Sequence, residues 1–102
     1  MMRAVFLRTL KPGVSLEDYL DAWMPENAGD LSNVRTSLSY SNTNDRQVLT
    51  VMEIDATPEE YGELAPTLVK ADAWERLDEI VESTEIETVF EEAYGPAKFG
   101  QA

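Results

Sequence analysis

The sequence predicts a single α+β domain whose elements follow one another as strand, helix, strand, strand, helix, strand. Three observations support this order: an apolar run over residues 4–10, a two-residue alternation over residues 34–40, and two stretches with helical spacing, which begin near residues 16 and 57. The 102 residues suit one domain, residues 1–102. The order is typical of the ferredoxin-like β-α-β-β-α-β fold, so we expect a four-stranded antiparallel sheet with both helical segments on one face.

The first half of the chain supplies a strand and a helix. Residues 4–10 are apolar at both parities, which predicts a central strand buried on both sides. Ser15, with Asp18 three residues later, predicts a helix N-cap, and Pro25 ends the helix that follows. Residues 26–33 are expected to form a loop.

Two strands joined by a hairpin are expected next. Over residues 34–40 the alternation places Val34, Leu38 and Tyr40 on one face. The polar run at residues 42–45 favours a hairpin loop, because Asn and Asp tolerate left-handed backbone conformations. Residues 48–54 are the second candidate for a central strand.

The second helical region has the strongest local signals. Thr57, Pro58 and Glu60 combine an N-cap, a proline at the first helical position and a capping-box glutamate. Pro66 predicts a break, and Asp72 with Glu75 predicts a second capping box that restarts the helix. The last strand is expected over residues 86–94, as an edge strand because of its glutamates, with residues 97–102 as a loose tail.

Composition limits the function. The net charge is −12, and residues 53–92 hold fourteen acids against Lys70 and Arg76. These acids form either a solvated helix face or a docking surface for a cationic partner. Nucleic-acid binding is disfavoured, because phosphate contacts need clustered basic residues. With no cysteine or histidine, copper-chaperone and zinc-thiolate sites are excluded, and we expect no metal, no haem and no other cofactor.

A sheet with both helices on one side leaves its other face open. Since the two central strands are apolar at both parities, that face needs cover, as large apolar patches usually mark interfaces. Together with the break at Lys11-Pro12-Gly13, Trp23 on the first helix and the segment Asp72–Leu77, the chain resembles the dimeric α+β barrel superfamily, which includes antibiotic-biosynthesis monooxygenase-like and EthD-like proteins.

The resemblance implies a homodimer, paired through the open sheet faces, with a small apolar pocket in each subunit between sheet and helices. Such a protein would bind a small organic molecule or act as a cofactor-free monooxygenase-like enzyme. The alternative is a non-enzymatic dimeric assembly or regulatory module. The branches that depend on a histidine are excluded. No membrane span or signal peptide is expected, and a cytoplasmic location is the corresponding expectation.

Four residues are candidates for the ligand pocket: Arg8, Arg35, Tyr40 and Trp74. Arg8, a charge in an apolar strand, would hold a carboxylate or enolate, or else pair with Glu53 or with a glutamate of the last strand. Arg35 would line the pocket or lie on a solvated edge. Tyr40 would donate a hydrogen bond to a ligand oxygen, and Trp74 would be an aromatic wall or ordinary core. No catalytic residue is assigned.

Overall fold

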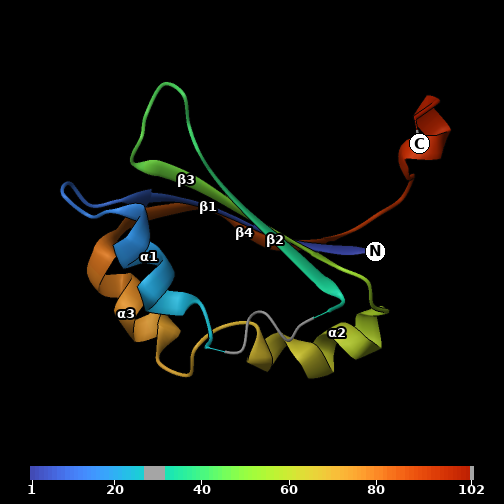
Figure 1. Ribbon diagram of the computed structural model, residues 1–102, viewed down its shortest axis with the longest axis horizontal. Helices are drawn as coiled ribbons and strands as arrows, with labels where there is room; N and C mark the ends of the chain where they lie inside the picture. Colours follow the sequence, from blue (N-terminus) through green and yellow to red (C-terminus); the bar gives the residue numbers. More distant parts are fainter. Residues whose placement is uncertain (27–31, 102) are drawn as a thin grey trace.

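The computed structural model describes residues 1–26 and 32–101, which form one sheet with helices against one side of it (Figure 1). In chain order the regular elements are β1 (Met2–Leu10), α1 (Leu16–Trp23), β2 (Val34–Tyr40), β3 (Gln47–Ile54), α2 (Pro58–Leu64), the 3₁₀ helix η2 (Ala65–Thr67), α3 (Ala73–Ile80), β4 (Val81–Glu91) and the 3₁₀ helix η3 (Pro96–Phe99). The prediction of a mixed α+β chain is confirmed.

The sheet is antiparallel and its strands lie in the order β2-β3-β1-β4. The two strands that the sequence predicts as central are β1 and β3, and both lie in the middle. Their register pairs Val5 with Val51 and Leu7 with Leu49. Both faces of the central strands therefore carry apolar side chains, as the two-sided apolar pattern predicts.

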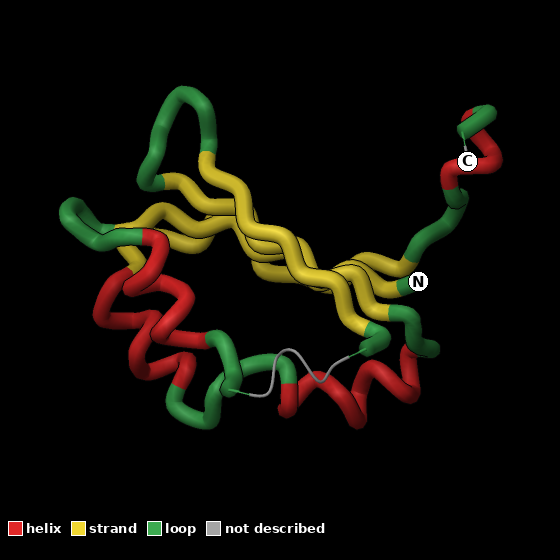
Figure 2. The backbone as a smooth tube through the Cα atoms, viewed as in Figure 1, coloured by secondary structure: helices red, strands yellow, loops and turns green. Residues whose placement is uncertain are grey.

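All three α-helices lie on the same side of the sheet (Figure 1; Figure 2). We call this side the helix face and the other side the open face. Along β3, burial alternates: Val48 and Ile54 point to the helix face and are fully buried, whereas Val51 points to the open face and is half-buried. The core lies between the helices and the sheet. Its buried apolar members are Met2, Ala4, Leu10, Tyr19, Ala22, Trp23, Val48, Met52, Ile54, Leu68, Ala73 and Leu77.

Two of the three predicted helix caps are present. The backbone N–H of Asp18 donates to Ser15 Oγ at 3.0 Å, and that of Glu60 donates to Thr57 Oγ1 at 3.2 Å. The hydrogen bonds from Thr57 lower the pKa of the Glu60 carboxyl. The capping box predicted at Asp72 is wrong: α3 begins after it, but its side chain makes no capping bond, because its backbone (φ −99°, ψ 14°) is not extended as an N-cap requires.

The break predicted at Pro66 is confirmed, since α2 gives way there to η2. The predicted bounds of the last strand are wrong, because β4 covers Val81–Glu91 instead of residues 86–94. Val81 is already extended (φ −96°, ψ 125°) and pairs with Leu10, so the chain passes from α3 into β4 without a loop. β4 is an edge strand, as its glutamates predict. The tail includes η3, and most of the predicted 26–33 loop lies outside the described residues.

Candidate functional site

Arg8 lies on the helix face of β1 with 5% of its surface exposed. Its Nη1 donates to Tyr19 Oη at 2.8 Å, and that oxygen lies 3.0 Å from Thr50 Oγ1. Its Nη2 lies 3.5 Å from Oε1 of Glu87 on β4. A buried guanidinium is costly unless it is partnered, so these contacts make Arg8 a structural link between β1, α1 and β4. The predicted pairing of Arg8 with a glutamate of the last strand is therefore present, and its alternative pairing with Glu53 is not.

Trp74 lies beside Arg8. The guanidinium carbon of Arg8 lies 5.9 Å from the Trp74 ring centre and 4.6 Å from that of Phe6. Trp74 is 54% exposed, so it is not the core residue that its helical spacing suggested. Arg8 and Trp74 both line a polar pocket of about 260 Å³ between α3 and β4. Its acidic lining residues are Asp78, Glu82 and Glu87. The negative charges of these carboxylates would repel an anionic ligand at Arg8. That Arg8 holds a ligand carboxylate or enolate therefore stays a prediction, and the surroundings of Arg8 do not favour it.

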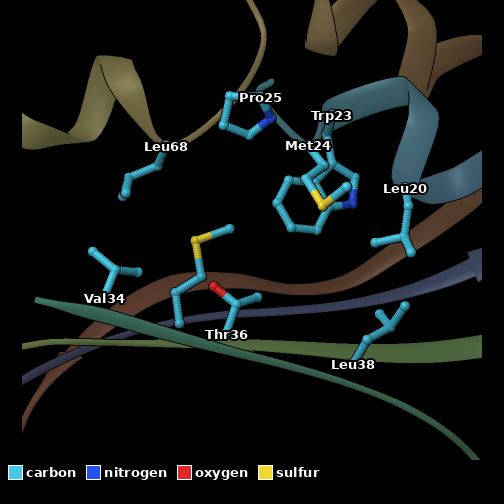
Figure 3. A pocket seen from close by; sticks show the side chains of 9 residues that line it. Leu20, Trp23, Met24, Pro25, Val34, Thr36, Leu38 and Leu68 are labelled. Carbon is cyan, nitrogen blue, oxygen red and sulfur yellow. The ribbon is translucent and has the colours of Figure 1, made fainter. Parts of the chain in front are cut away.

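A second, apolar pocket of about 210 Å³ lies between α1 and the β2–β3 side of the sheet (Figure 3). It is lined by Leu20, Trp23, Met24, Pro25, Val34, Thr36, Leu38, Met52 and Leu68. Figure 3 shows these side chains around a shared space, with the Thr36 hydroxyl turned toward it. Among residues 1–26 and 32–101, none of the side chains that line it is ionisable. This apolar pocket therefore resembles a binding site more than an acid–base centre.

Trp23 gives the apolar pocket a buried polar atom. Its side chain is 4% exposed, and its Nε1 has no hydrogen-bond partner among the described residues. In Figure 3 the nitrogen lies on the side of the indole that faces Leu20, another lining residue. A buried donor without a partner is costly. Because Nε1 is buried, its hydrogen is not open to the pocket, and the Thr36 hydroxyl is the polar group that a ligand in the pocket can reach.

The two pockets are separated by packed side chains. A space of only about 10 Å³ lies between them, and it shares Trp23 and Met52 with the apolar pocket and Arg8 and Trp74 with the polar one. That volume holds roughly one water at most. Arg8 consequently does not line the apolar pocket.

The other two candidates lie away from both pockets. Arg35 is exposed on the open face of β2, opposite Glu53 on β3. Tyr40 is 61% exposed at the end of β2, beside a surface hollow that Ser15 and Asp45 also line. The structure thus brings Arg8 and Trp74 together, and it joins neither Arg35 nor Tyr40 to them. Any contact of these four residues with a ligand stays a prediction.

The apolar pocket draws on residues that were not candidates, chiefly Thr36, Met52 and Leu68. The sequence did contain a signal for part of the apolar pocket. The alternation of residues 34–40 placed Val34 and Leu38 on one face of an edge strand, and the nearest helix ends just before Pro25. A short helix beside an apolar edge leaves uncovered space. The contribution of Leu68 had no signal in the sequence.

The open face has an apolar centre and charges at one end. The apolar side chains are Val5, Leu7, Leu49, Val51, Ile86 and Phe90. At the end of the sheet, Arg3 Nη2 pairs with Glu92 at 2.9 Å and with Glu53 at 3.1 Å. The hydrogen bond with Glu92 is the largest cause of the raised pKa of the Arg3 guanidinium, and the bond with Glu53 adds to it. Phe90 is 53% exposed, so none of the residues that the structure describes covers this centre fully.

No family model matches the chain, and comparisons with curated proteins and with solved structures give no match. Across residues 1–26 and 32–101, no helix is long and apolar enough to cross a bilayer. In the same residues, no three acidic side chains converge as metal ligands would. The function is therefore argued from the pockets and the open face.

Proposed function

We propose that the chain adopts the ferredoxin-like fold, that it forms a homodimer of the dimeric α+β barrel type through its open face, and that each subunit binds a small, mainly apolar organic molecule in the apolar pocket. The strand order supports the fold: β1 and β2 flank β3, and β3 and β4 flank β1, so each helical crossover spans one intervening strand. The apolar pocket is the observation that carries the binding function.

The surface of the single chain supports a dimer. Its accessible area is 6810 Å², whereas a monomer of 11.4 kDa is expected to expose about 5800 Å². The excess of roughly 1000 Å² is similar to the ~800 Å² that each partner buries in a standard interface. The radius of gyration, 14.5 Å, also exceeds the ~13 Å expected for a compact chain of this length.

The composition of the open face also suits a second copy of the chain. A two-fold interface uses the same surface on both subunits, so the surface must complement itself. An apolar centre can pack against another apolar centre. The charged end has both signs, since Arg3 and the exposed Arg35 lie near Glu53. Two copies can therefore meet without placing only like charges together.

The size and chemistry of the apolar pocket limit the ligand. A cavity of about 150 Å³ is enough for benzene, and sites for drug-sized ligands begin near ~300 Å³. The apolar pocket, at about 210 Å³, thus suits a molecule of one ring or a short branched chain. The Thr36 hydroxyl, which is turned toward the pocket, favours a ligand that carries an oxygen atom. Since no ionisable side chain of the described residues lines the pocket, we propose binding and assign no catalytic residue.

A thermal-shift measurement with three single-ring probes tests the binding function. Benzaldehyde and phenol each carry an oxygen acceptor, and toluene carries none. We expect benzaldehyde and phenol to raise Tm with concentration, by ~4–8 °C for each kcal/mol of binding linkage in a domain of this size. Toluene should give a smaller rise, because it cannot form a hydrogen bond with the Thr36 hydroxyl.

A pocket-filling variant supplies the control. Thr36→Phe places a ring in the apolar pocket and should abolish the probe-dependent rise, whereas Thr43→Phe, in the β2–β3 loop, should keep it. An equal rise in the Thr36→Phe variant would place the binding elsewhere. If no probe raises Tm while the dimer is intact, the alternative of a non-enzymatic dimeric module is favoured.

A further inference from the structure

Residues 92–101 form an arm that leaves the body of the molecule. Figure 1 shows the arm rising from the end of β4 on the side of the sheet opposite the helices, and Figure 2 shows the same path. Beyond Glu92, whose N–H donates to Met1 O at 2.9 Å, the backbone hydrogen bonds of the arm stay inside it. The arm therefore extends past the open face, and within the described part of the chain its backbone hydrogen bonds connect it to the sheet only at its base.

The arm nevertheless has a defined local structure. η3 spans Pro96–Phe99, and Gly100 follows in the left-handed conformation (φ 75°), which glycine adopts without strain. Lys98 Nζ lies 5.4 Å from the ring centre of Tyr94. Isolated segments of this length rarely keep such structure in water, so a surface that receives the arm would explain why its sequence specifies a turn.

Two large aromatic side chains of the arm have no cover. Tyr94 is 67% exposed and Phe99 is 69% exposed, the two highest values among the large exposed hydrophobic residues of the described chain. Single exposed apolar residues are normal on protein surfaces. Two exposed aromatics on one projecting segment are different, because together they form an uncovered apolar patch on the open-face side of the sheet.

We infer that the arm docks on a second copy of the chain and packs against it at the edge of the open-face interface. A copy seated on the open face lies alongside the arm, since both are on the same side of the sheet (Figure 1). The charge also fits: Lys98 is the one charged residue in positions 93–101, and each copy carries a net charge of −12. This inference rests on the proposed homodimer and adds exchange of the two arms to it.

Sedimentation equilibrium on point variants measures the contribution of the arm. Phe99→Ala should raise the dimer Kd about 100-fold, because each dimer has two arms and burial of each ring contributes roughly tenfold. Tyr40→Ala is the matched control: it removes an aromatic ring that is 61% exposed at the far end of β2. Its Kd should stay within about twofold of the parent value.

Photo-crosslinking locates the arm directly. A chain with p-benzoylphenylalanine in place of Phe99 is mixed with an isotope-labelled full chain that carries no probe, and we expect crosslinks to the labelled chain, because the arm reaches the body of its partner. The same probe in place of Tyr40 should give none. A parent chain that stays monomeric overturns both the homodimer and the arm exchange. A dimeric parent whose Phe99→Ala variant matches Tyr40→Ala, or whose crosslinks at position 99 are all intrachain, overturns the arm exchange alone.

Discussion

A lysine in place of Val51 should break the dimer and leave the subunit folded. Val51 lies on β3 at the centre of the open face, between Val5 on β1 and Ser37 on β2. It is half-buried in the single chain, so a lysine there can extend its ammonium group into water. In a face-to-face dimer that group would be buried between Val5 and Ser37, and Glu53, two residues further along the same face, is already paired with Arg3.

The expected magnitude follows from the cost of an unpaired buried charge, which is about 3–5 kcal/mol. Each dimer of the variant would hold two such lysines. Even one cost of ~3 kcal/mol raises the dimer Kd by roughly 100-fold or more. A dimer that forms at micromolar concentration in the parent should therefore be monomeric in the Val51→Lys variant under the same conditions.

Sedimentation equilibrium measures the oligomeric state of the variants, and far-UV circular dichroism measures whether they are folded. The comparison variant is Val48→Lys, three residues earlier on the same strand, where the side chain is fully buried under the helices. We expect Val51→Lys to be a folded monomer and Val48→Lys to be unfolded. A Val51→Lys variant that dimerises as tightly as the parent would refute the open-face interface. Unfolding of Val51→Lys would refute the claim that this face tolerates a charge in the free subunit.

Three further predictions concern stability. Tyr19→Phe leaves Nη1 of the buried Arg8 without its hydrogen-bond acceptor and should lower the free energy of unfolding by about 1–3 kcal/mol in urea titration. Thr57→Ala removes a capping bond and should cost about 1 kcal/mol, whereas Asp72→Ala should cost much less, because Asp72 makes no capping bond. Hydrogen bonds from two hydroxyls, of which that of Ser83 has the larger effect, lower the pKa of the Glu85 carboxyl below its usual 4.5. These bonds therefore stabilise the fold above that pH. The stabilisation is lost as the pH falls through the lowered pKa. The stability difference between the parent and Glu85→Gln, in urea titrations at several pH values, should accordingly be present at pH 7 and shrink in acid; a pH-independent difference would contradict this assignment.

Much of the fold was predictable because its signals are local. The two-sided apolar pattern of residues 4–10 and 48–54 identifies the central strands without any knowledge of pairing. The caps at Ser15 and Thr57 depend on residues three positions apart, so the sequence alone shows both partners. The error at Asp72 has the opposite cause: the residue types fit a cap, but the preceding chain arrives with the wrong backbone angles.

The candidate site was less predictable because it depends on contacts between distant residues. Arg8 stands out as a charge in an apolar strand, and it does lie beside Trp74. Its partner Tyr19 reaches it from α1, and no sequence spacing indicates that contact. The alternation that placed Tyr40 with Leu38 was right, but Tyr40 lies at the strand end, where its side chain stays exposed.

The mass of the unmodified chain in solution tests the central claim most directly. Sedimentation equilibrium at micromolar concentration should give twice the 11.4 kDa mass of one chain. That result is expected because the apolar centre of the open face is uncovered and the 6810 Å² surface of the chain exceeds that of a compact monomer by roughly 1000 Å². A mass of 11.4 kDa throughout the micromolar range would contradict the account.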